Sequence, residues 1–150
     1  MRARHCNWVR LRDRKSGAEF RVLDIHLDHK SDDARREQMK MIVGECAQYA
    51  DGFPQIICGD FNSGIENAPV ACLRDAGWQE AYEAVHGPGE AGFTYHGFKG
   101  PDYRKKNARR IDFIFVRGNL QPVAAEILRD KVDGLYPSDH YFLMSDFIIQ

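Results

Sequence analysis

The sequence has no long apolar run. Its longest stretches without a charged residue are eight residues, whereas a membrane-spanning helix needs about 20 mostly apolar ones. The basic start at residues 1–5 is followed by no apolar segment of the kind found in secretory signals. We therefore expect no membrane span and no secretory signal. Hydrophobic residues make up 43% and charged residues 29% of the chain, which excludes wholesale disorder and collagen-like structure.

Cysteine is also sparse. The four cysteines, at positions 6, 46, 58 and 72, form no Cys-x-x-Cys pair. A secreted disulfide framework has more cysteines in a shorter chain, and a zinc site has more closely spaced ligands. We interpret all four as buried free thiols and expect a reducing, cytoplasmic location.

The net charge of −1 hides an uneven distribution. Residues 1–21 contain seven Arg and Lys against two acids, and residues 99–110 contain six against one. Two local basic stretches over an acidic remainder favour an anionic substrate over general coating of nucleic acid. Solvated loops and charged strand faces would produce the same pattern.

Segments of strand and helix character alternate along the chain. The strongest helix pattern begins after Ser31 as its cap and carries an apolar stripe from Met39 to Ala50. A weaker helix is expected over residues 67–76. Strands are expected at residues 7–12, 19–27, 55–58, 111–116, 123–128 and 141–149. This alternation predicts a layered α/β or α+β sandwich.

Gly59-Asp60-Phe61-Asn62 is the sharpest local motif. Asp60 and Asn62 should project to one side just past a buried strand, with Phe61 pointing into the core. Ligands usually bind at this position in α/β sheets. The carboxylate can accept a proton from water or bind a metal, and the amide can donate to a phosphate oxygen. An Asx-rich turn would also explain these residue types.

Two further motifs offer an acid and a histidine. In Ser138-Asp139-His140-Tyr141, the imidazole suits proton transfer near neutral pH, and Asp139 is a hard oxygen ligand for a divalent cation. Asp112 lies in a strand that otherwise has core character, so its carboxylate needs a partner. An imidazole would suit, because a carboxylate fixes its tautomer and favours its charged form. We predict an Asp112–His140 pair, with Arg110 as the competing partner.

The end of the second expected strand reads His26-Leu-Asp28-His29. His26 lies nearer the strand interior than the others and is a candidate functional residue. Asp28 and His29 fit the polar decoration of an exposed strand end. Thr94-Tyr-His-Gly has too little context to support a prediction of its own.

Taken together and in this order, the motifs resemble the endonuclease/exonuclease/phosphatase superfamily. They are His-Leu-Asp-His at 26–29, Gly-Asp-Phe-Asn at 59–62, Arg-Ile-Asp-Phe-Ile-Phe at 110–115 and Ser-Asp-His-Tyr at 138–141. The segment Thr-Tyr-His-Gly-Phe at 94–98 is similar to one common in bacterial members. The resemblance runs from about Trp8 to Ile148. It implies a deoxyribonuclease-I-like four-layer α/β sandwich with the site at one end.

The resemblance also implies a role for each matching residue. Asp60 resembles the acid that orients and deprotonates the attacking water, and Asn62 the amide that positions phosphate and water. His140 resembles the histidine that contacts the scissile phosphate. Asp112 resembles the acid that holds this histidine, and Asp139 resembles a metal-site carboxylate. His26 resembles an additional histidine that some members use near the leaving group. The implied cofactor is Mg²⁺ or Mn²⁺, with Asp139, Asp60 and Asn62 as the candidate metal residues.

Two elements of the family pattern have no counterpart here. Members carry an early Asn and a later Glu that is the principal magnesium ligand, and this chain begins after both. Glu19, Glu37 and Glu45 stand in the wrong context to replace that Glu. We expect residues 1–150 to be the C-terminal part of one family domain. Because sheet edges and apolar faces would be left uncovered, we expect self-association or pairing with the missing N-terminal portion.

The activity implied by the resemblance is metal-dependent hydrolysis of a phosphate mono- or diester. The expected substrate is a small phosphorylated metabolite or a general phosphodiester. The alternative is an endo- or exonuclease that binds nucleic acid, although the basic stretches lack the interleaved aromatics of a single-strand stacking platform apart from Tyr103. A further alternative is a catalytically impaired fragment that acts as a binding module.

Overall fold

The computed structural model describes residues 4–89, 92–103 and 108–150. The strands are β1 (Cys6–Arg12), β2 (Glu19–His26), β3 (Gln55–Asp60), β4 (Gln79–Glu80), β5 (Asp112–Arg117), β6 (Leu120–Leu128) and β7 (Phe142–Ile149). The helices are α1 (Asp32–Cys46), α2 (Ala68–Asp75), α3 (Ala81–His86) and the 3-10 turn η1 (Gly100–Asp102). The predicted alternation of strands and helices is confirmed.

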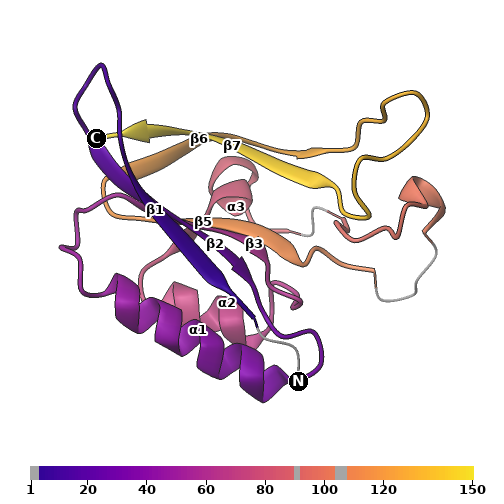
Figure 1. Ribbon diagram of the computed structural model, residues 1–150, viewed down its shortest axis with the longest axis horizontal. Helices are drawn as coiled ribbons and strands as arrows, with labels where there is room; N and C mark the ends of the chain where they lie inside the picture. The colour runs from indigo at the N-terminus through magenta and orange to yellow at the C-terminus, as the bar shows by residue number, and fades with distance from the viewer. Residues whose placement is uncertain (1–3, 90–91, 104–107) are drawn as a thin grey trace.

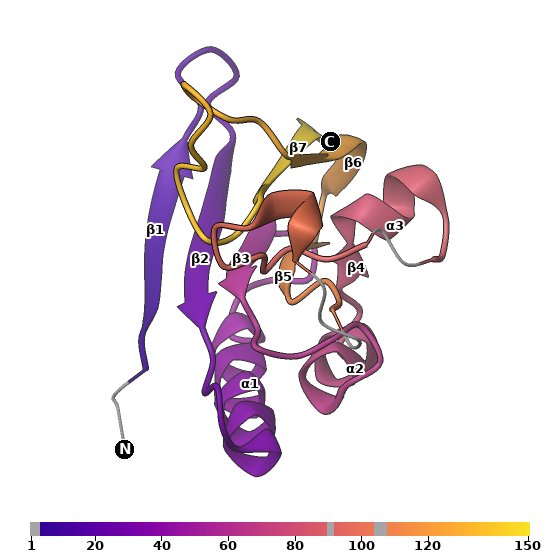
Figure 2. The same cartoon turned by 90° about the vertical axis from the view of Figure 1, so that its right-hand side faces the viewer.

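Five of these strands form one sheet in the order β1-β2-β3-β5-β4, and β6 pairs with β7 in a separate sheet. β2 and β3 run parallel, with α1 as the crossover between them, and the neighbouring pairs are antiparallel. Figure 1 shows α1 and α2 below the larger sheet and the β6–β7 pair above it, and Figure 2 shows the same layers from the side. α3 lies on the β6–β7 side of the larger sheet and packs against β5 and β6.

The core fills the space between the larger sheet and the helices α1 and α2. Ser31 caps α1 as predicted, because its hydroxyl accepts a hydrogen bond from Ala34 N at 3.1 Å. The helix ends at Cys46, so the expected stripe does not reach Ala50 as helix. The buried apolar side chains of the core are Leu23, Ile25, Leu27, Met39, Ile42, Cys46, Ile57, Phe61, Ile65, Val70, Leu73, Trp78, Phe113 and Phe115.

β2 and β3 approach each other closely just before the chain reaches Asp60. Gly59 has φ of +131°, and a Cβ added there would lie 2.1 Å from the Ile25 carbonyl oxygen. Only glycine fits a backbone position of this kind without strain. Gly59 therefore allows β3, the strand that ends at Asp60, to lie this close to β2.

The expectation that all four cysteines are buried needs correction. Cys6 is exposed, and Cys58 and Cys72 are only partly buried, so Cys46 is the one cysteine that fits the expected buried thiol. Cys6 lies on β1, one of the two edge strands of the larger sheet, and every residue of β1 is exposed. Among the described residues, no helix has the length and apolar character to cross a membrane.

Candidate active site

Three of the predicted site residues lie in one row across the larger sheet. His26 pairs with Asp60 in the β2–β3 register, and Asp60 pairs with Asp112 in the β3–β5 register. Directly paired residues project to the same face of a sheet. Phe61, the next residue after Asp60, is fully buried, so the row projects to the face away from α1 and α2. The strand register therefore accounts for the convergence of residues 34 and 52 positions apart in the sequence.

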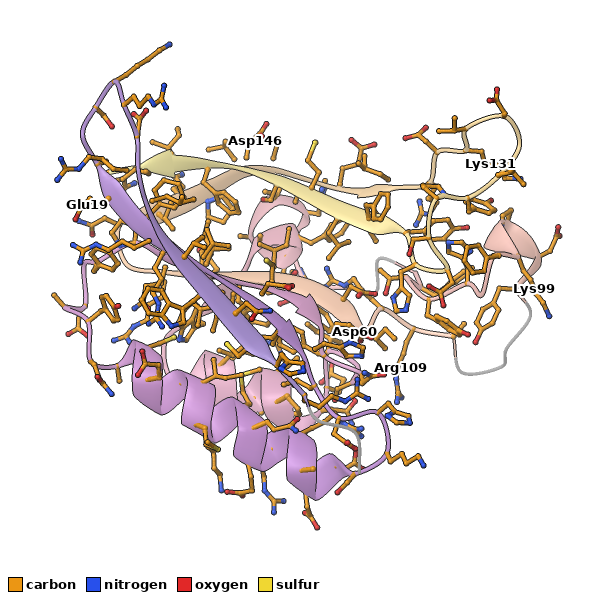
Figure 3. The ribbon with its side chains drawn as sticks, in the orientation of Figure 1. Glu19, Asp60, Lys99, Arg109, Lys131 and Asp146 are labelled. Carbon is orange, nitrogen blue, oxygen red and sulfur yellow. The ribbon has the colours of Figure 1, made fainter. Side chains whose placement is uncertain are left out.

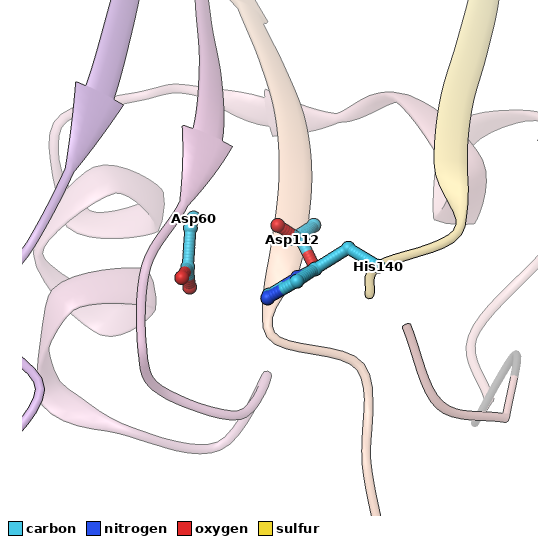
Figure 4. A group of neighbouring side chains, drawn as sticks. All are labelled: Asp60, Asp112 and His140. Carbon is cyan, nitrogen blue, oxygen red and sulfur yellow. The ribbon is translucent and has the colours of Figure 1, made fainter. Parts of the chain in front are cut away.

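His140 approaches this row from the other sheet, just before β7. Its Nδ1 donates a hydrogen bond to Asp112 Oδ2 at 2.8 Å, and the side chains are 23% and 15% exposed. This contact confirms the predicted Asp112–His140 pair. Figure 4 shows Asp60, Asp112 and His140 projecting into the same space beyond the ends of β3 and β5. Arg110, the competing partner, instead forms a buried ion pair with Glu80.

The hydrogen bond from His140 to Asp112 raises the pKa of the imidazole above its ordinary value, against the opposing effect of burial. The charges of Asp112, Asp60 and Asp139 act in the same direction. A ring so placed keeps its proton at a higher pH than an exposed histidine does. His140 is therefore suited to donate a hydrogen bond or a proton to an anionic group.

Asp60 is the acid that is not paired with His140. Burial raises the pKa of its carboxyl, while the backbone N–H of Asn62, which donates to Asp60 Oδ1 at 2.7 Å, lowers it. Asn62 has φ of +49°, a left-handed conformation that asparagine tolerates better than most residues. Its side-chain amide donates to the Leu27 carbonyl at 3.0 Å. Asn62 therefore bonds both to Leu27, the residue that follows β2, and to the Asp60 carboxylate, and so holds the two in place relative to each other.

The site is suited to a cation by its donor set. Asp60, Asp112 and His140 each offer one ligand atom, and these atoms lie within 4.8 Å of one another. Carboxylate oxygens suit Mg²⁺ and Mn²⁺, and an imidazole is tolerated better by Mn²⁺. Asp112 Oδ2 is occupied by His140 and Asp60 Oδ1 by the backbone N–H of Asn62, so each carboxylate keeps one oxygen for a cation.

Asp139 is not part of this three-residue group. Its backbone carbonyl accepts hydrogen bonds from His96 N at 2.8 Å and Gly97 N at 3.0 Å, and its charge raises the pKa of His140. The structure thus places Asp139 beside the dyad (Asp112 with His140) without bringing its carboxylate among the ligand atoms of Asp60 and Asp112.

His26 contacts both the acid and a basic residue that the sequence analysis did not single out. Its Nε2 lies 2.9 Å from Arg4 Nη1 and 3.4 Å from Asp60 Oδ2. An arginine can only donate, so Nε2 accepts from Arg4 and cannot at the same time donate to Asp60. Arg4 also contacts His29 Nδ1. Arg4 belongs to the basic stretch of residues 1–21. That stretch was the sequence signal for a basic side chain near His26.

Comparison with known proteins agrees with this geometry. A sequence model described as the endonuclease/exonuclease/phosphatase family matches residues 4–140. The chain belongs to the endonuclease/exonuclease/phosphatase family. No curated protein matches the sequence.

Several solved structures share the fold of this chain. A functionally unknown conserved protein from Enterococcus faecalis is 25% identical with a TM-score of 0.84, the match covering 97% of this chain and 56% of that one. A mannosyl-6-phosphatase from Bacteroides thetaiotaomicron is 22% identical with a TM-score of 0.81, covering 97% and 57%. TDP2 from D. rerio, complexed with a single-strand DNA product, is 18% identical with a TM-score of 0.72, covering 95% and 62%. The expected deoxyribonuclease-I-like α/β fold is therefore confirmed, and this chain spans a little over half the length of these proteins.

Proposed function

We propose that this chain carries an active site for divalent-metal-dependent hydrolysis of phosphate mono- or diesters, with a small phosphorylated metabolite or a general phosphodiester as substrate. The observation that carries the proposal is the convergence of Asp60, Asp112 and His140 within 4.8 Å. Membership of a family described by endonuclease, exonuclease and phosphatase activity supports it.

Asp60 is the base in this reaction. Burial raises the pKa of its carboxyl, so this carboxylate takes a proton from water more readily than an exposed one does. The oxygen of that water forms the new bond to phosphorus while the ester P–O bond breaks. Asn62 is the proposed amide that positions water and phosphate, since its side-chain nitrogen donates one N–H to the Leu27 carbonyl and keeps a second N–H for this role.

His140 is the group that stabilises charge on the phosphate. Asp112 accepts a hydrogen bond from Nδ1–H, which leaves Nε2 to donate to a phosphoryl oxygen, and the raised pKa of the ring favours its charged form. The histidine near the leaving oxygen is His26. Asp60, Asn62 and Asp139 are the residues proposed to hold a divalent cation, which would neutralise charge on the phosphoryl oxygens, and of these three only Asp60 belongs to the group of converging ligand atoms.

The nuclease alternative is favoured by one feature of charge placement. In Figure 3, Arg109 is labelled close to Asp60 near the middle of the molecule, and Lys99 and Lys131 lie further out on the right. Basic side chains around a phosphoesterase site would suit a polyanion. Cleavage of plasmid DNA together with a steep loss of affinity on adding salt would favour a nuclease. Cleavage of a sugar phosphate with no DNA binding at low salt would favour the metabolite.

We also propose that residues 1–150 correspond to the C-terminal part of one family domain and act with a covering partner, either a second copy or the remaining portion of the domain. β1 is an edge strand on which Trp8 and Val9 are 51% exposed. β6 and β7 form only a two-stranded sheet, and Phe142 and Ile148 are 50% and 52% exposed. Isolated strand pairs are marginal, and apolar faces of this kind favour association. Sedimentation should show concentration-dependent association, and a compact monomer at high concentration would contradict the proposal.

The test of the catalytic proposal combines metal binding with turnover. Titration with Mn²⁺ and hydrolysis of bis-p-nitrophenyl phosphate are measured for the chain, alone and with its covering partner. Asp60→Ala and His140→Ala should each lower turnover by on the order of 10² or more. Asp75→Ala, an exposed acid at the end of α2, is the matched control and should leave turnover unchanged. If neither metal binding nor turnover is detected in any form, the binding-module alternative is favoured and the catalytic proposal is wrong.

A further inference from the structure

A short segment, residues 94–97, lies between the two halves of the dyad. Thr94 is fully buried, and its hydroxyl oxygen accepts hydrogen bonds from the backbone N–H groups of Ile111 and Asp112 at 3.1 and 3.3 Å. These two N–H groups belong to the point where the chain enters β5. The hydroxyl therefore fixes the backbone that carries the acid of the dyad.

The same segment also holds the histidine of the dyad. The carbonyl of Thr94 accepts a hydrogen bond from Tyr141 N at 2.9 Å, and Tyr95 forms an antiparallel bridge with His140. The Tyr95 ring meets the imidazole edge-on, with ring centroids 5.1 Å apart and planes inclined by 61°. His140 is therefore held on its backbone and on its ring by residues 94 and 95.

The segment matters because the dyad joins two separate sheets. Asp112 belongs to the five-stranded sheet, while His140 precedes β7 of the two-stranded sheet. No ladder of strand hydrogen bonds connects these sheets in the described residues. A bond of 2.8 Å between them needs a support of its own, because catalytic groups must be held within about 0.5 Å of their working geometry.

We propose that Thr94 is a positioning residue of this active site, whose hydroxyl holds Asp112 in register with His140 across the two sheets. The inference rests on the proposed phosphoesterase function. The role requires an oxygen acceptor at this position. Valine has the same shape as threonine, but it would leave the partly buried N–H groups of Ile111 and Asp112 without this acceptor. Serine would keep the acceptor.

The experiment compares four proteins: the parent chain and its Thr94→Ser, Thr94→Cys and Thr94→Val variants, in which the acceptor at position 94 becomes progressively weaker. The first readout is the downfield proton resonance of the His140 Nδ1–H bonded to Asp112, assigned by its loss in His140→Gln. The second is kcat and KM for bis-p-nitrophenyl phosphate. Ser145→Ala, which removes a hydroxyl hydrogen bond to the Ala124 carbonyl inside the β6–β7 pair, is the matched control.

We expect the serine variant and the Ser145→Ala control to keep both the resonance and kcat. In the valine variant the resonance should be lost to exchange, and kcat should fall roughly tenfold or more with little change in KM, because misplaced groups lower the rate more than binding. The cysteine variant should be intermediate, and it carries the test if the valine variant does not fold.

The inference is overturned if the cysteine variant, and the valine variant where it folds, keep the resonance of the parent. An equal loss in Ser145→Ala would overturn it too, since the effect would then be general destabilisation. The His140 Nδ1–H resonance can be measured whether or not the protein is active. An inactive protein whose resonance follows the acceptor series would contradict the proposed function while supporting the role of Thr94.

Discussion

The buried pair of Arg110 and Glu80 allows a prediction of large magnitude. The two nitrogens Nη1 and Nη2 of Arg110 lie 3.1 and 3.2 Å from the two carboxylate oxygens of Glu80, and the side chains are only 2% and 1% exposed. The guanidinium also lies over the rings of Phe113 and Tyr82, 4.7 and 5.1 Å from their centroids. Glu80 in addition caps α3, since its Oε2 accepts from Glu83 N at 2.8 Å.

Replacing Glu80 by alanine removes both functions of this side chain. Leaving a buried charge without its partner costs about 3–5 kcal/mol, and losing a helix cap costs about 1 kcal/mol. The expected loss, on the order of 4–6 kcal/mol, is a large part of the 5–15 kcal/mol that a typical domain has. Urea unfolding followed by circular dichroism measures it.

The double variant Glu80→Leu with Arg110→Met is the control that separates charge from packing. Removing both charges in favour of apolar side chains of similar size is often close to neutral, so this variant should be clearly more stable than Glu80→Ala. The reasoning is refuted if Glu80→Ala loses less than about 1 kcal/mol, or if the double variant is as unstable as the single one.

Two further predictions concern the dyad and the backbone. The pKa of His140 is raised above its ordinary value of 6.5 by Asp112, so the stabilisation from this pair is present below pH 6.5 and is lost as the pH rises through the folded-state pKa. With chelator present, Asp112→Asn should remove this decline from the pH dependence of the unfolding free energy, and an unchanged profile would contradict it. Gly59→Ala should cost more than about 3 kcal/mol, because the new methyl would lie 2.1 Å from the Ile25 carbonyl. Gly44→Ala, with nothing within 4 Å in the last turn of α1, should raise stability by up to about 1 kcal/mol, and thermal melts that rank the two the other way would refute the backbone argument.

Local chemistry made parts of this site predictable. A carboxylate in a strand of core character requires a partner, and this requirement identified the Asp112–His140 contact without any knowledge of the distance. The sequence left Arg110 open as a competing partner of Asp112, because Glu80, the residue that pairs with Arg110, lies on β4, a strand of two residues. Elements as short as β4 and α3 have no periodicity to detect.

Other positions depended on contacts between the sheets. Thr94 sits in a segment without regular structure, and its importance comes from hydrogen bonds to residues 17 and 18 positions later. Asp139 directly precedes His140 in the sequence, whereas Asp112 lies 28 positions before it. Which carboxylate meets the imidazole depends on how the turn before β7 folds onto residues 94–97, and a linear motif does not encode this.

The location of the dyad at the junction of two sheets gives it a particular sensitivity to partial loosening. Slight parting of the β6–β7 pair from the larger sheet would separate His140 from Asp112 while leaving the backbone ladders of both sheets whole. The proposed activity should therefore be lost on mild heating or in low denaturant before any change in the far-ultraviolet spectrum. A bound phosphate, by bridging the two sides, would delay that early stage more than the later collapse of the core.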